Sequence, residues 1–123
     1  MPLIILIVNE IVFRDAIERA SREEGMKSLC LKDEDAFWAA LQELTPKLIL
    51  LEIGIPTLDG AELIQKLKRN SSTRKIPIVA FGNSLRADLL QDAKEMGADL
   101  VLPKSAFREQ LPEIIRHYDK QHK

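Results

Sequence analysis

The segment from Leu48 to Gly60, which reads L-I-L-L-E-I-G-I-P-T-L-D-G, constrains the fold of this chain more than any other. Its four consecutive apolar residues lead directly to one carboxylate, Glu52, and a turn containing Gly and Pro follows. An uninterrupted apolar run between turn residues is typical of a strand that is buried on both faces of a parallel sheet. Glu52 would then lie at the carboxyl edge of the sheet, where open α/β folds place their ligands and chemistry.

Four other apolar runs have the character of strands, and each is followed by a segment with helical spacing. Asn83 or Ser84 is expected to cap the fourth helix. Proline deep inside a helix removes a hydrogen bond, so the regular part of the last helix is expected to begin within about a turn of Pro112. The predicted strands are residues 3–8, 27–31, 47–52, 76–81 and 99–102, with a helix after each.

This alternation predicts a parallel sheet with helices on both faces, folded as a single domain over residues 1–123. The favoured arrangement is the flavodoxin-like, doubly wound α/β sandwich with strand order 2-1-3-4-5. In that order the carboxyl ends of the first, third and fourth strands converge at one edge. The residues brought to this edge would be Asn9, Glu10, Glu52, Gly82, Asn83 and, just past the fifth strand, Lys104.

Composition and charge exclude several classes of function. The net charge of -1 argues against electrostatic binding to nucleic acid or to an acidic membrane. Cys30 is the only cysteine, and we expect it to be buried in its strand as a small apolar residue. The apolar N-terminus lacks the features of a signal peptide, and no run is long enough to span a bilayer, so a cytoplasmic location is expected.

Four segments of the chain resemble the receiver domain of bacterial two-component response regulators, the CheY-like superfamily, and the resemblance covers essentially the whole chain. The resemblance implies phosphorelay signal transduction, in which the domain catalyses its own phosphorylation on an aspartate after the third strand, using a divalent cation. The segments are I-L-I-V-N-E, P-K-L-I-L-L-E-I-G-I-P-T-L-D-G, K-I-P-I-V-A-F-G-N and M-G-A-D-L-V-L-P-K.

The resemblance also assigns positions, and most of them carry a different residue type here. Glu52 stands at the phosphoacceptor position, while Asn9 and Glu10 stand at the family's acidic pair. Lys104 keeps the family's lysine. The switch positions are taken by Gly82, Asn83 and Val101, of which Gly82 has no hydroxyl and Val101 has no aromatic ring.

These departures predict a pseudo-receiver that is not phosphorylated and that acts as a protein-interaction module rather than an enzyme. Glu52 is one methylene longer than aspartate, and phosphoryl transfer depends on positioning. Three alternatives stay open: a receiver still phosphorylated on Glu52 or elsewhere, a Glu52 that imitates phosphoaspartate, and a purely structural ion pair between Glu52 and Lys104. Small-molecule binding has less support, because the chain has no nucleotide-binding or metal motif.

No cofactor is expected to be required, and Mg²⁺ is the one candidate. Glu10 and Glu52, with Asn9 at the other acidic-pair position, would form at most a weak cation site, and an empty pocket is the alternative. The expected partner is a signalling protein, namely a histidine kinase, an output protein or another receiver. It would dock on the face from Leu85 to Tyr118, with the chain itself a monomer or a weak homodimer.

Overall fold

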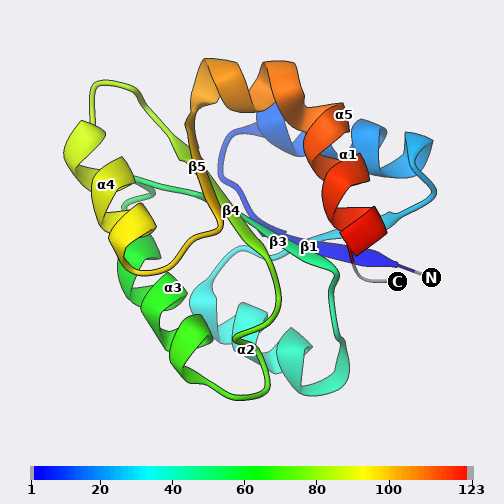
Figure 1. Ribbon diagram of the computed structural model, residues 1–123, viewed down its shortest axis with the longest axis horizontal. Helices are drawn as coiled ribbons and strands as arrows, with labels where there is room; N and C mark the ends of the chain where they lie inside the picture. The colour runs from blue at the N-terminus through cyan, green and yellow to red at the C-terminus, as the bar shows by residue number, and fades with distance from the viewer. Residues whose placement is uncertain (1, 122–123) are drawn as a thin grey trace.

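The computed structural model describes residues 2–121 and contains one five-stranded parallel sheet in the order β2-β1-β3-β4-β5, which confirms the predicted topology. Helices and strands alternate along the chain (Figure 1). The strands are β1 (Leu3–Ile7), β2 (Lys27–Cys30), β3 (Leu48–Glu52), β4 (Ile78–Gly82) and β5 (Leu100–Pro103). The helices are α1 (Ile11–Glu23), α2 (Glu34–Glu43), α3 (Gly60–Arg69), α4 (Ala87–Glu95) and α5 (Lys104–Gln121).

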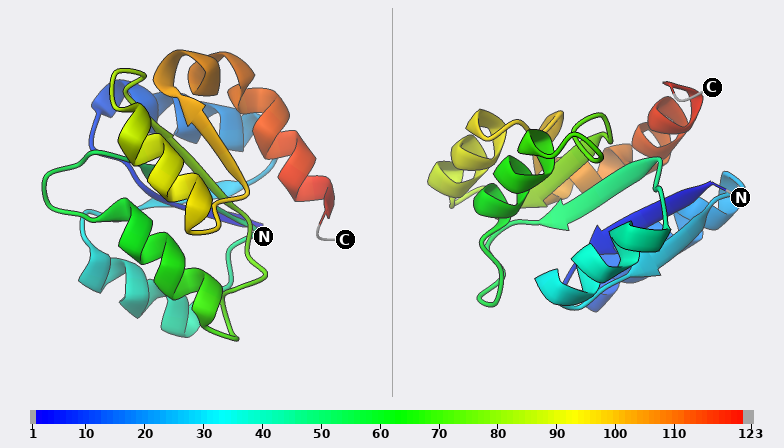
Figure 2. Two further views of the ribbon diagram at one scale, coloured as in Figure 1. Left: turned by 60° about the vertical axis from the view of Figure 1, so that its left-hand side comes forward. Right: turned by 90° about the horizontal axis from the view of Figure 1, so that it is seen from below.

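The sheet is covered on both faces, as Figures 1 and 2 show, with α1 and α5 on one face and α2, α3 and α4 on the other. Side chains alternate along a strand, so Leu48 and Leu50 of β3 pack against the first layer and Ile49 and Leu51 against the second. Every residue of β3 and β4 is buried. The long apolar run in the sequence therefore reflects a central strand with no solvent-facing side.

Helix α5 differs from the prediction, because it runs through Pro112 without interruption from Lys104 to Gln121. Pro112 is exposed, so the carbonyl group that loses its hydrogen bond faces water. On the opposite side, buried Phe107 and Ile115 anchor the helix before and after the proline. The Phe107 ring also stacks on Phe81 of β4, with 4.0 Å between the ring centroids. Packing against the sheet thus holds the helix together across a residue that disfavours it.

Helix α4 begins later than predicted, and neither candidate cap is used. Its N-cap residue is Arg86, which makes no side-chain capping hydrogen bond. The Oδ1 atom of Asn83 instead accepts a hydrogen bond from the backbone N–H of Leu85 at 2.9 Å. This local turn takes the chain away from the helical path for several residues. Leu85 is thereby left on an exposed loop between β4 and α4.

Cys30 is exposed, so the expectation of burial was wrong. The cause is the position of β2, which pairs only with β1 and forms one edge of the sheet. The thiol lies 3.9 Å from the carbonyl oxygen of Val8 at the end of the neighbouring strand. Within residues 2–121, no helix has the length and apolar character needed to cross a membrane.

Candidate functional site

The Glu52 side chain lies at the carboxyl edge of the sheet, between the ends of β1 and β4, and is only 6% exposed. Its Oε1 atom accepts hydrogen bonds from the backbone N–H groups of Asn9, at 2.7 Å, and of Glu10, at 3.1 Å. Both amides precede α1, so the carboxylate also lies near the positive end of that helix. Hydrogen bonds of this kind to an ionised oxygen are among the stronger ones in proteins.

Lys104 approaches the same carboxylate from the first residue of α5. Its Nζ atom donates to Oε1 of Glu10 in a close ion pair and lies 3.7 Å from Oε2 of Glu52. The hydrogen bond to Glu10, reinforced by the charges of Glu10 and Glu52, raises the pKa of Lys104 above its usual value and outweighs the effect of partial burial. The ammonium group therefore stays charged between two carboxylates.

The structure brings together four of the residues assigned from the sequence: Asn9, Glu10, Glu52 and Lys104. The ion pair between Glu52 and Lys104, which was one of the open alternatives, is present, although Glu10 is the nearer partner of the lysine. The two backbone amides that hold Glu52 were not foreseen. Nothing in the sequence marks them, because any residue except proline supplies the same N–H group.

The three residues assigned to switch positions by resemblance are Gly82, Asn83 and Val101, at the end of β4, in the loop after it and in β5. Gly82 ends β4 and is packed tightly: a Cβ atom placed there would lie 3.2 Å from the carbonyl oxygen of Ile53 and 3.3 Å from a methyl group of Leu90. Val101 of β5 is partly buried and packs against the core on the α3 and α4 face. Asn83 makes the local turn described above and contributes nothing to Glu52. A side chain at position 82 would therefore crowd Ile53 and Leu90.

The resemblance implies a divalent cation at this edge, and the residues present do not fit one. Magnesium takes near-octahedral oxygen ligands and is usually bound through carboxylates together with waters. Here Oε1 of Glu52 already accepts two N–H groups, and Glu10 is paired with the ammonium of Lys104. Asn9 adds no charge. Across the described chain, no three His, Cys, Asp or Glu side chains gather as a metal site would require.

Comparison with known proteins identifies the family of this chain. The model of the response regulator receiver domain family matches residues 4–116. Among solved structures, the chain is similar to the signal receiver domain of a signal transduction histidine kinase from Syntrophus aciditrophicus. The TM-score is 0.86 at 19% sequence identity, and the match covers 100% of this chain and 93% of that one. At this level of identity, the likeness concerns the fold.

Two curated relatives differ in the share of their own length that the match covers. It is 23% identical over 114 residues to sporulation initiation phosphotransferase F of Bacillus subtilis strain 168, covering 92% of this chain and 82% of that protein. It is 33% identical over 101 residues to the phosphate regulon transcriptional regulatory protein PhoB of Escherichia coli strain K12, covering 82% of this chain. The match spans 44% of the length of PhoB.

Proposed function

The chain belongs to the response regulator receiver family of two-component signalling, and we propose that within this family it is a pseudo-receiver. In this proposal residues 1–123 form a single receiver-like domain that accepts no phosphoryl group at Glu52 and acts by binding other signalling proteins. The domain performs no catalysis of its own. Its conformation at the carboxyl edge of the sheet is fixed rather than switched.

The observation that carries the proposal is the inward hydrogen bonding of Glu52. A phosphoacceptor oxygen needs a free lone pair in line with the incoming phosphorus, and small displacements from that line cost large factors in rate. One oxygen of Glu52 is bound by two backbone N–H groups, and the other faces Lys104. With 6% of the residue exposed, a phosphoryl donor has little access to either.

Charge and packing support the same proposal. Phosphoryl transfer relies on cations that neutralise the developing negative charge, and the carboxylates here do not fit Mg²⁺. A hydroxyl-bearing side chain at position 82, which the family's switch would use, would crowd Ile53 and Leu90. Imitation of phosphoaspartate by Glu52 has less support, because Gly82 and Val101 lack the hydroxyl and the ring that would respond.

The test is the intact mass of the protein after incubation with acetyl phosphate and Mg²⁺. The parent protein should show no added phosphoryl group, and Glu52→Gln should behave in the same way. Glu52→Asp is the matched variant that restores the shorter nucleophile. A phosphoryl adduct on the parent that disappears in Glu52→Gln would favour the alternative function, a phosphorylation switch, over the pseudo-receiver.

The partner in this proposal is a signalling protein, namely a histidine kinase, an output protein or another receiver, which docks on the face from Leu85 to Tyr118. Leu85 offers a test of this choice, because its side chain is 87% exposed on the loop before α4. If the partner is a second copy of the chain, sedimentation should detect a weak dimer that Leu85→Asp dissociates. Ser84→Asp is the neighbouring exposed control and should leave the dimer unchanged.

A further inference from the structure

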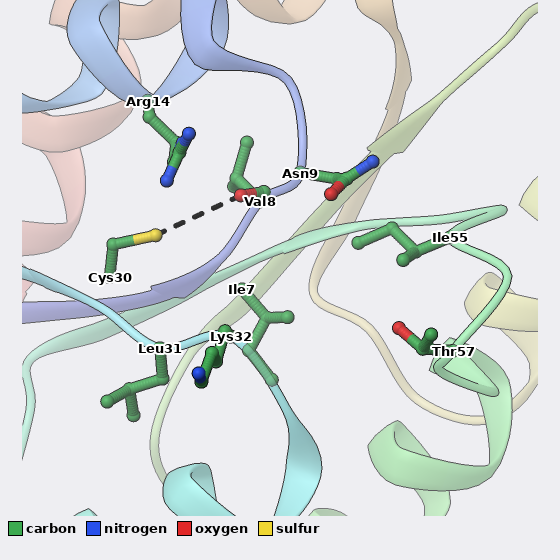
Figure 3. A pocket seen from close by; sticks show the side chains of 9 residues that line it. All are labelled: Ile7, Val8, Asn9, Arg14, Cys30, Leu31, Lys32, Ile55 and Thr57. Carbon is green, nitrogen blue, oxygen red and sulfur yellow. Dashed lines mark hydrogen bonds between the residues drawn. The ribbon is translucent and has the colours of Figure 1, made fainter.

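A cavity lies at the carboxyl edge of the sheet, beside Asn9 (Figure 3). It encloses about 150 Å³ over the ends of β1 and β2. Arg14 of α1 and Cys30 stand on one side, and Ile55 and Thr57 of the β3–α3 loop stand opposite them. The remaining lining residues are Ile7, Val8, Asn9, Leu31 and Lys32.

The two charged residues that line this cavity are both basic. Arg14 and Lys32 are its charged residues, and no carboxylate lines it. Neither of them forms an ion pair within the described residues. The Nε atom of Arg14 is also buried without any hydrogen-bond partner.

We propose that this cavity binds a small phosphate-type oxyanion, either free phosphate or the phosphate group of a small organic molecule. Arg14 is suited to this role, because its planar guanidinium matches the oxygens of a phosphate group. Lys32 supplies a second positive charge, and the side chains of Asn9 and Thr57 add neutral donors. The cavity also lies where doubly wound sheets usually bind their ligands, outside the carboxyl ends of the strands.

Asn9 connects this cavity to Glu52. Its side chain lines the cavity, while its backbone N–H donates to the Glu52 carboxylate. A ligand held beside Asn9 would therefore act on the segment that fixes Glu52 without any covalent change. The inference does not depend on whether Glu52 is phosphorylated, since its readout is reversible binding rather than a mass adduct.

The test is a titration of the ¹⁵N-labelled protein with inorganic phosphate at constant ionic strength, followed by amide chemical shifts. Saturable shifts are expected at Asn9, Cys30 and Lys32. Arg14→Gln should weaken binding about tenfold or more, because it removes a charged hydrogen bond to the anion. Arg19→Gln, at an exposed position on the same helix, is the matched control and should leave the affinity unchanged.

A second variant, a thiol-reactivity measurement and a second ligand accompany the phosphate titration. Lys32→Ala changes an exposed residue and should weaken binding even if Arg14→Gln fails to fold. Cys30 is the only cysteine and lines the cavity, so phosphate should slow its reaction with a thiol reagent. Glycerol phosphate binding more tightly than phosphate would identify an organic ligand, and equal affinities would identify free phosphate. Absence of saturable shifts, or equal weakening by Arg14→Gln and Arg19→Gln, would overturn the proposal.

Discussion

The Oε1 atom of Glu52 lies 2.7 Å from the backbone nitrogen of Asn9, across residues 43 positions apart in the sequence. The end of β3 is thereby fixed to the loop that leads into α1. In the proposed assignment Glu52 takes the family's phosphoacceptor position, and its side chain accepts hydrogen bonds from the backbone of Asn9 and Glu10. The additional methylene group of Glu52 extends its carboxylate to these amides, and Lys104 completes the arrangement from α5.

Removing the Glu52 carboxyl group should destabilise the domain more than removing its charge. Glu52→Ala leaves the amides of Asn9 and Glu10 without an acceptor in a largely buried place, which should cost about 1–3 kcal/mol. Glu52→Gln keeps an oxygen that can accept both hydrogen bonds, so its cost should be smaller. Urea denaturation of the two variants and the parent measures the difference. Equal stability of the two variants would show that the amides do not depend on this acceptor.

Restoring a hydroxyl residue at position 82 should not rebuild a switch and should reduce stability. The Cβ atom of Gly82→Thr would press against the carbonyl oxygen of Ile53 and against Leu90, and overpacking of this kind costs about 1–3 kcal/mol. Thermal unfolding measures the change. Ser84→Thr, on the neighbouring exposed loop, is the control and should stay within about 0.5 kcal/mol of the parent. An unchanged stability for Gly82→Thr would mean that Ile53 and Leu90 can move apart at little cost in free energy.

The contribution of Lys104 to stability should disappear at high pH. Its pKa is raised in the folded state by the hydrogen bond to Glu10, so the folded protein holds this proton more tightly than the unfolded chain. The stabilisation is complete below the unfolded pKa of about 10.4 and is lost as the pH rises through the higher folded value.

The measurement is the difference in melting temperature between the parent and Lys104→Met, followed from neutral to alkaline pH. This difference should be constant up to about pH 10 and should shrink above it. Burial also raises the pKa of Tyr118, but that residue is present in both proteins and cancels in the comparison. A difference that shrinks already near neutral pH would contradict the assignment.

Pro112→Ala should stabilise the protein, because α5 continues through this position. Alanine restores the missing backbone hydrogen bond at an exposed site, and proline in a helix interior is less favourable than alanine by roughly 3 kcal/mol, which sets the upper limit of the gain. Urea denaturation checks the effect, with Glu113→Ala as the exposed neighbouring control. A loss of stability in Pro112→Ala would mean that the proline shapes the helix in a way the fold requires.

The sequence predicted the fold because the pattern of apolar residues is dense and regular. The run before Glu52 identified a central strand, and the alternation of strands and helices led to the observed strand order. The same reasoning placed Glu10, Glu52 and Lys104 at one edge, because the carboxyl ends of parallel strands lie together. These inferences rest on the spacing of apolar residues and on the parallel direction of the strands, both of which follow from the sequence.

The incorrect predictions concern features that tertiary packing decides. Pro112 was given its intrinsic helix-breaking role, whereas Phe107 and Ile115 hold the helix across it. Cys30 was assigned to the core on composition, although its strand lies at the edge of the sheet. The cavity around Arg14 carried no motif, because its lining comes from three separated segments whose contact depends on the complete fold.

The most direct test of the account is a Mg²⁺ titration of the ¹⁵N-labelled protein, with the amide signals of Asn9 and Glu10 as the readout. These amides donate to Glu52, so any cation that recruits the carboxylate must change their shifts. The account predicts no saturable change in the parent and a gain of Mg²⁺ binding in the double variant Asn9→Asp, Glu52→Asp. Saturable shifts of both amides in the parent would show that Glu52 is free to bind a cation and would contradict the account.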